Sequence, residues 1–128
     1  MEIDAVSAVP EERQQSLLPA VNSVCHSVHL KLKDELDGEK LSELLKKVRQ
    51  NVPGLIELHF GANDMQAYPK KTESPDGNTH ALFSRHQNGQ YLKIYQTHPA
   101  HLELANYLLS KAERPPTVID FVNIKSHL

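Results

Sequence analysis

The sequence has no tryptophan, and its only cysteine is Cys25. A single cysteine cannot form a disulfide within the chain, which fits a reducing compartment or one where disulfides are not needed. No apolar run approaches the roughly 18 residues that cross a membrane. The first twenty residues also lack the apolar stretch of a secretory signal. We therefore expect no membrane partner.

The sequence also lacks an excess of charge of one sign. Its 14 lysines and arginines stand against 16 aspartates and glutamates, which gives a net charge of −2. Proteins that bind nucleic acid usually carry a broad basic surface, so we expect no nucleic-acid partner. With 39% apolar and 23% charged residues over 128 positions, the composition is that of one ordinary globular domain.

Histidine is the residue present in unusual number, with eight copies. Its side chain changes charge near neutral pH, so the position of each copy bears on chemistry. None is spaced as HxH or HExxH, the patterns typical of zinc sites, and we expect no metal site. Four of them are scattered over the predicted strands, namely His29, His59, His80 and His86.

Hydrophobic periodicity predicts four strands and two helical regions. Val24, His26 and Val28 alternate with more polar positions, which places His26 on the apolar face of the first strand. Asp37 is a good N-cap for the first helix, and Pro99 suits the first position of another. We expect strands over 24–33, 56–60, 79–86 and 118–124, and helices over 38–50, 90–96 and 99–113.

This order, β-α-β-β-α-β, predicts an α+β fold of the ferredoxin-like type. Its four-stranded antiparallel sheet would carry both helical regions on one face. The other face would be uncovered, and we expect Ile119 and Phe121 to point toward it. An uncovered apolar sheet face invites a partner, so we expect a homodimer joined sheet to sheet.

Three further segments lie outside these elements. Residues 61–78 are polar and read as a long loop, and loops of this length are often functional. Residues 1–20 read as a flexible extension ahead of a domain over 21–125. Residues 126–128, Ser-His-Leu, resemble a peroxisomal targeting tripeptide, so we expect a peroxisomal or cytoplasmic location.

Five motifs in this order resemble the stress-response A/B barrel family. The first strand resembles V-x-H-x-V-x-x-K-x-K, and the second ends in an aromatic-Gly pair. The others resemble G-x-T-H, Y-x-x-H-P-A-H and D-[FY]. In this chain the motifs stand at Val24 to Lys33, Phe60-Gly61, Gly77 to His80, Tyr95 to His101, and Asp120-Phe121.

The resemblance implies an antiparallel homodimer whose two sheets close into a barrel. The family includes plant stress proteins and polyketide cyclases that perform an aldol closure without a cofactor. It implies a pocket between sheet and helices for a small apolar or polyketide-like ligand. By the same resemblance His101 would be the catalytic base, Tyr95 would assist it, and His26 would line the pocket.

The residues themselves support a base at His101. If Pro99 begins a helix, His98 is its N-cap and His101 lies in the first turn. The positive end of the helix dipole and burial both disfavour an imidazolium there. A neutral imidazole can accept a proton.

Other interpretations stay open. A histidine at a helix start often only caps or packs, and the chain would then be a non-catalytic stress-related or ligand-binding dimer. A haem or oxygen enzyme is a weaker third possibility, because other dimeric α+β barrels carry such chemistry.

Overall fold

The computed structural model describes residues 23–124, and residues 1–22 and 125–128 are not described. The extension predicted over 1–20 and the tripeptide predicted over 126–128 therefore lie outside the described residues. Within the described part of the chain, no helix is long and apolar enough to cross a membrane.

The described chain forms an antiparallel sheet of four strands together with three helices, which confirms the predicted ferredoxin-like α+β fold. The strand order in the sheet is β2-β3-β1-β4. In chain order the elements are β1 (Val24–Leu30), α2 (Gly38–Asn51), β2 (Leu55–Ala62), β3 (His80–His86), α3 (Gly89–Thr97), α4 (Pro99–Ser110) and β4 (Thr117–Val122).

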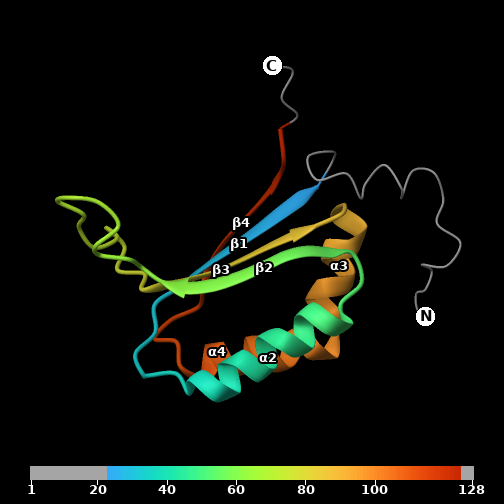
Figure 1. The fold of residues 1–128 in the computed structure, drawn as a ribbon, viewed down its shortest axis with the longest axis horizontal. Helices are drawn as coiled ribbons and strands as arrows, with labels where there is room; N and C mark the ends of the chain where they lie inside the picture. The colour runs from blue at the N-terminus through green and yellow to red at the C-terminus, as the bar shows by residue number, and fades with distance from the viewer. Residues whose placement is uncertain (1–22, 125–128) are drawn as a thin grey trace, which may run out of the picture.

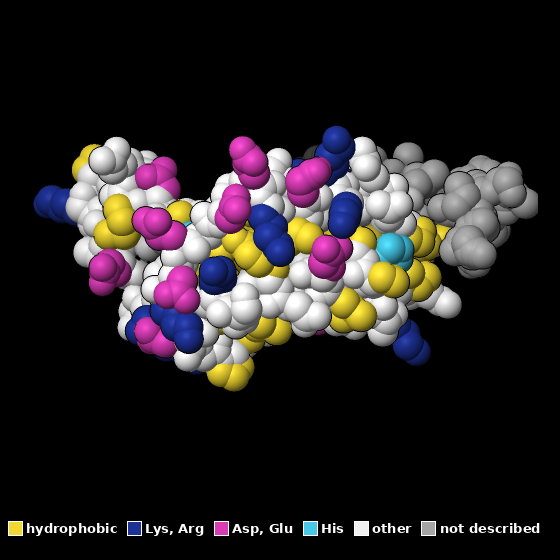
Figure 2. Space-filling model, turned by 90° about the horizontal axis from the view of Figure 1, so that it is seen from below, with side chains coloured by type: hydrophobic (Ala, Val, Ile, Leu, Met, Phe, Trp, Pro, Cys, Tyr) yellow, Lys and Arg dark blue, Asp and Glu magenta, His cyan; other side chains and the backbone are white. Residues whose placement is uncertain are grey.

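The helices cover one face of the sheet, and the core lies between the two layers (Figure 1). Helix α2 begins after Asp37, whose side chain accepts hydrogen bonds from the backbone of Glu39 and Lys40. Its outer face is charged, and acidic and basic side chains are mixed over the helical side of the molecule (Figure 2). The buried side chains of the core include Leu30, Leu44, Val48, Leu58, Leu82, Leu92, Leu104 and Leu108.

Strand β1 and helix α4 are both shorter at their C-terminal ends than predicted. The first strand ends at Leu30 because Leu32 leaves the sheet pairing and forms an isolated bridge with Ala112. The same bridge ends α4 at Ser110 instead of 113, since Lys33 N–H donates to the Lys111 carbonyl at 2.9 Å. The last strand was also misplaced by one or two residues at each end.

The strand register separates the residues of the two sheet faces. Cys25 pairs with Phe121 and Ser27 with Ile119, so these four residues lie on the face opposite the helices. Ile119 and Phe121 remain 56% and 46% exposed, as expected for an uncovered sheet face. Ser27 also pairs with Phe83 of the neighbouring strand β3, so Phe83 lies on this open face as well.

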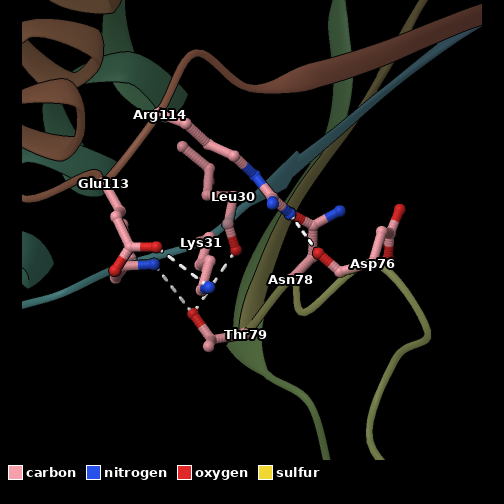
Figure 3. Close-up of polar contacts among 8 residues, drawn as sticks. Leu30, Lys31, Asp76, Asn78, Thr79, Glu113 and Arg114 are labelled. Atoms are coloured by element: carbon pink, nitrogen blue, oxygen red, sulfur yellow. Dashed lines mark hydrogen bonds and ion pairs between the residues drawn. The ribbon is translucent and has the colours of Figure 1, made fainter.

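The long β2–β3 loop extends from one end of the sheet and is tied back to the α4–β4 connection (Figures 1 and 3). Arg114 Nη2 donates to Asn78 Oδ1 at 2.9 Å and to the Asp76 carbonyl. Lys31 pairs with Glu113 at 2.9 Å beside this bond. The guanidinium therefore fastens the C-terminal part of the loop.

We expect Arg114→Ala to raise amide hydrogen exchange over residues 76–79 by about fivefold, since it removes roughly 1 kcal/mol of hydrogen bonding. Exchange followed by mass spectrometry measures this. Arg49→Ala is the matched control, because Arg49 donates to the Leu58 carbonyl at 2.7 Å, away from the loop. Equal exchange in the two variants would contradict an anchoring role for Arg114.

Candidate functional site

A cluster of aromatic rings lies between the sheet and the helices, with Tyr95 of α3 at its centre. The Tyr95 ring lies 4.1 Å from His101 of α4, 4.6 Å from His86 of β3 and 5.9 Å from His26 of β1, measured between ring centroids. The structure thus brings the three predicted site residues, His26, Tyr95 and His101, into one group. Tyr95 is 0% exposed, whereas His101 is half-buried, so the group meets the surface on the His101 side.

His26 is held by a carboxylate from the neighbouring strand. Its Nδ1 pairs with Asp120 Oδ1, because β1 and β4 place these two residues opposite each other. A carboxylate only accepts, so Nδ1 of His26 carries a hydrogen. The Asp120 side chain is 43% exposed, and the pair thus runs from the core to the surface.

The junction of α3 and α4 fixes His101. The His98 Nδ1 accepts the Ala100 N–H at 3.0 Å, which makes His98 the N-cap of α4 as predicted. The His101 Nδ1 lies 3.2 Å from the Gln96 carbonyl. A carbonyl only accepts, so the hydrogen of the ring is on Nδ1 and the lone pair is on Nε2.

Protonation states in the cluster favour a neutral base beside a protonated phenol. Burial lowers the pKa of His101, the charges of His26 and His98 act in the same direction, and the Gln96 carbonyl opposes them. Burial raises the pKa of Tyr95 to about 12, with Ser84 acting against it. At pH 7 His101 is therefore ready to accept a proton and Tyr95 to donate a hydrogen bond.

Sequence reasoning missed three members of the cluster, His86, Ser84 and Asp120. His86 had been grouped with the scattered strand histidines, but it is fully buried, and its Nε2 lies 2.8 Å from Ser84 Oγ. The period of two along β3 puts both on the face of Leu82, which was the signal available in the sequence. Among the described residues, no group of three or more His, Cys, Asp or Glu side chains is placed to hold a metal ion.

The buried His86 makes the fold sensitive to acid. Burial, followed by the charges of His26 and His101, lowers the pKa of His86 to about 4 from 6.5. The unfolded chain binds this proton below pH 6.5 and the folded chain does not, so stability falls as pH drops from 6.5 to 4. We expect a loss of about 3 kcal/mol from this group.

Urea unfolding at pH 7, 5.5 and 4.5 measures the loss. His86→Phe should lose less stability across this range than the wild type, because it removes the group that the unfolded chain protonates. Parallel pH profiles for the two proteins would show that His86 is not the acid-sensitive group.

The two larger hollows found in the described part of the chain lie away from the ring cluster. One of about 490 Å³ is lined by β2 residues together with Arg49. Another of about 350 Å³ lies under the long loop and is lined by Lys31, Asn63 and Asn78 among others. Neither includes Tyr95 or His101.

Solved structures share this architecture. The hydroxynitrile lyase from Passiflora edulis is 19% identical, with 84% of this chain and 98% of that chain covered and a TM-score of 0.64. A dimeric ferredoxin-like protein of unknown function from Jannaschia sp. CCS1 is 21% identical, covering 78% and 98% with a TM-score of 0.62. The Arabidopsis thaliana protein At3g17210 is 25% identical, covering 82% and 99% with a TM-score of 0.61.

No curated protein matches the sequence significantly. The family model described as the stress responsive A/B barrel domain matches residues 24–123, almost all of the described chain. This match agrees with the sheet order, the helical layer and the motif at the α3–α4 junction. The chain therefore belongs to the stress responsive A/B barrel domain family.

Proposed function

We propose that the chain is a homodimeric, cofactor-independent enzyme that performs polyketide-cyclase-like aldol chemistry on a small carbonyl compound, with His101 as the base. The observation that carries the proposal is the contact between the Tyr95 and His101 rings at 4.1 Å. Their pKa values are shifted in opposite directions, which gives a neutral base beside a protonated donor.

The reaction follows from these two groups. His101 Nε2 removes a proton from a carbon between two carbonyls, while the Tyr95 hydroxyl donates to the oxygen on which the enolate forms. The enolate carbon attacks a second carbonyl of the same ligand, and a carbon–carbon bond forms. The imidazolium of His101 then returns the proton to the new alkoxide, so protons and charge balance without a cofactor.

The open sheet face supports the homodimer. Ile119 and Phe121 expose apolar area that a monomer would leave in water. A structural neighbour from Jannaschia is described as dimeric and shares the fold. A second copy of this chain, packed sheet to sheet, would bury this face and close a barrel.

The hydroxynitrile lyase neighbour suggests a second substrate to try. Cleavage of a hydroxynitrile breaks a carbon–carbon bond, whereas the aldol closure forms one, but it too begins when a base removes a proton, here from a hydroxyl group. A carbonyl forms, cyanide leaves, and the imidazolium returns the proton to cyanide. The same His101 would serve, although the likeness at 19% identity shows the fold alone.

Incubation of the wild type with a poly-β-keto thioester and with mandelonitrile, with products followed by mass spectrometry, tests the proposal. Cyclised product above the uncatalysed rate supports aldol closure. Binding in a thermal shift experiment with no turnover of either compound would instead indicate a non-catalytic ligand-binding or stress-related dimer.

Asp120 gives a further prediction for this site. Asp120→Ala removes the acceptor of His26 Nδ1–H, so we expect turnover to fall about tenfold or more. Asp120→Asn keeps an acceptor oxygen and should retain more activity than the alanine variant. Steady-state kinetics compare the two, and equal turnover in Asp120→Ala and the wild type would exclude a positioning role.

A further inference from the structure

A buried polar pair lies against Tyr95, and the proposed reaction makes no use of it. His86 and Ser84 come from β3, on the face that the helices cover. Both are 0% exposed, and so is Tyr95. Polar groups at such depth cost stability unless they are hydrogen-bonded, and this pair therefore calls for a physical explanation.

The hydrogen of the His86 ring can be placed from its surroundings. Nε2 lies 2.8 Å from Ser84 Oγ, whereas Nδ1 is buried with no hydrogen-bond partner in the described part of the chain. The ring is neutral at pH 7, because burial lowers the pKa of His86 to about 4. A buried N–H without a partner is rarer than an unpaired acceptor, so the hydrogen belongs on Nε2. His86 thus donates to Ser84.

The Tyr95 hydroxyl is the next polar group that Ser84 can reach. Its oxygen is buried without a partner in hydrogen-bond geometry, yet Ser84 is near enough to lower the pKa of Tyr95. Once Ser84 Oγ has accepted from His86, its own hydrogen is free to turn toward Tyr95. A rotation of the Ser84 side chain that brings Oγ into hydrogen-bond geometry with Tyr95 Oη would complete the contact.

We propose that His86 and Ser84 are positioning residues that set the direction of the Tyr95 hydroxyl. His86 Nε2–H donates to Ser84 Oγ, and Ser84 O–H donates to Tyr95 Oη. Tyr95 O–H is then left to donate toward a ligand beside His101, whose ring centroid lies 4.1 Å from that of Tyr95. The three hydrogen bonds share one direction, from the core outward.

This direction restricts the class of ligand, a consequence that rests on the proposed function. The group that meets Tyr95 must accept a hydrogen bond, as a carbonyl oxygen or an enolate does. A ligand that presents only donors there, such as an ammonium group, leaves the Tyr95 hydrogen unpaired. Carbonyl compounds with an acidic carbon–hydrogen bond satisfy both Tyr95 and the neutral His101.

Nuclear magnetic resonance on the full chain at pH 7 tests the hydrogen-bond chain without any turnover. Labelling with ¹⁵N-histidine reports which ring nitrogen carries the hydrogen, and ¹³C at Cζ of tyrosine reports hydrogen bonding of each phenol. His86→Phe keeps an aromatic ring against Tyr95 but removes the donor, whereas His86→Gln keeps a donor. Tyr95→Phe assigns the Tyr95 resonance.

The expected result is an Nε2–H tautomer for His86 in the wild type. The Tyr95 Cζ resonance should move in one direction in both His86→Phe and Ser84→Ala, and His86→Gln should stay near the wild-type position. An Nδ1–H tautomer, or a Tyr95 resonance that stays in place in Ser84→Ala, overturns the proposal. If His86→Phe does not fold, the wild-type tautomer and Ser84→Ala decide it.

These readouts separate the two claims. A protein with the expected tautomer and resonance shifts but no turnover keeps the hydrogen-bond chain and loses the proposed reaction. Turnover in a protein whose His86 is the Nδ1–H tautomer would keep the proposed reaction and exclude the hydrogen-bond chain.

Discussion

Replacing His101 with glutamine should lower kcat for carbonyl cyclisation about a hundredfold or more, because a positioned general base contributes factors of this size. The variant should remain folded, since the His101 side chain is only half-buried and is not part of the aliphatic core. Steady-state kinetics measure the loss, and circular dichroism checks the fold.

The matched control for this change is Leu102→Gln. Leu102 is the next residue of the same helix and is 45% exposed, so its substitution should leave kcat near the wild-type value. A loss of activity in His101→Gln no greater than in Leu102→Gln would remove His101 from the reaction.

The pH dependence of the wild type follows from the same group. His101 acts as a base only when neutral, and burial lowers its pKa below the ordinary 6.5. The rate should therefore be level near pH 7 and fall as the pH drops through the lowered pKa.

The second large effect concerns assembly. Phe121→Lys should convert the proposed dimer to a monomer, because it places a charge on the open sheet face that two copies would share. Light scattering after size exclusion gives the mass directly.

Leu109→Lys is the control for this experiment. Leu109 of α4 is also 46% exposed, but it lies in the helical layer and away from the open face. The Leu109→Lys variant should therefore keep the mass of a dimer. A dimer that survives Phe121→Lys and dissociates in Leu109→Lys would place the interface on the helices.

Much of the fold could be predicted because each element depends on its own residues. The stripe formed by Leu44, Leu45 and Val48 specifies α2, and Pro99 separates α3 from α4. The ends of β1 and α4 were misjudged because Leu32 pairs with Ala112, a contact between distant parts of the chain. Local periodicity carries no information about such pairing.

The candidate site was likewise predicted only in part from the sequence. His26, Tyr95 and His101 were found through their motifs, whereas His86 and Ser84 stand in a strand that reads as ordinary β structure. Their place under Tyr95 follows only from the strand register and from which face α3 covers. A period of two offers two faces, and only the packed structure decides between them.

Deuterium exchange tests the central claim most directly, because proton abstraction by His101 needs no cyclisation. The protein is incubated in D₂O with a β-keto thioester too short to cyclise, and loss of the methylene signal is followed by proton NMR. We expect exchange well above the uncatalysed rate in the wild type and near that rate in His101→Gln. Exchange at the uncatalysed rate in the wild type, or equal exchange in the two proteins, would contradict His101 as the base.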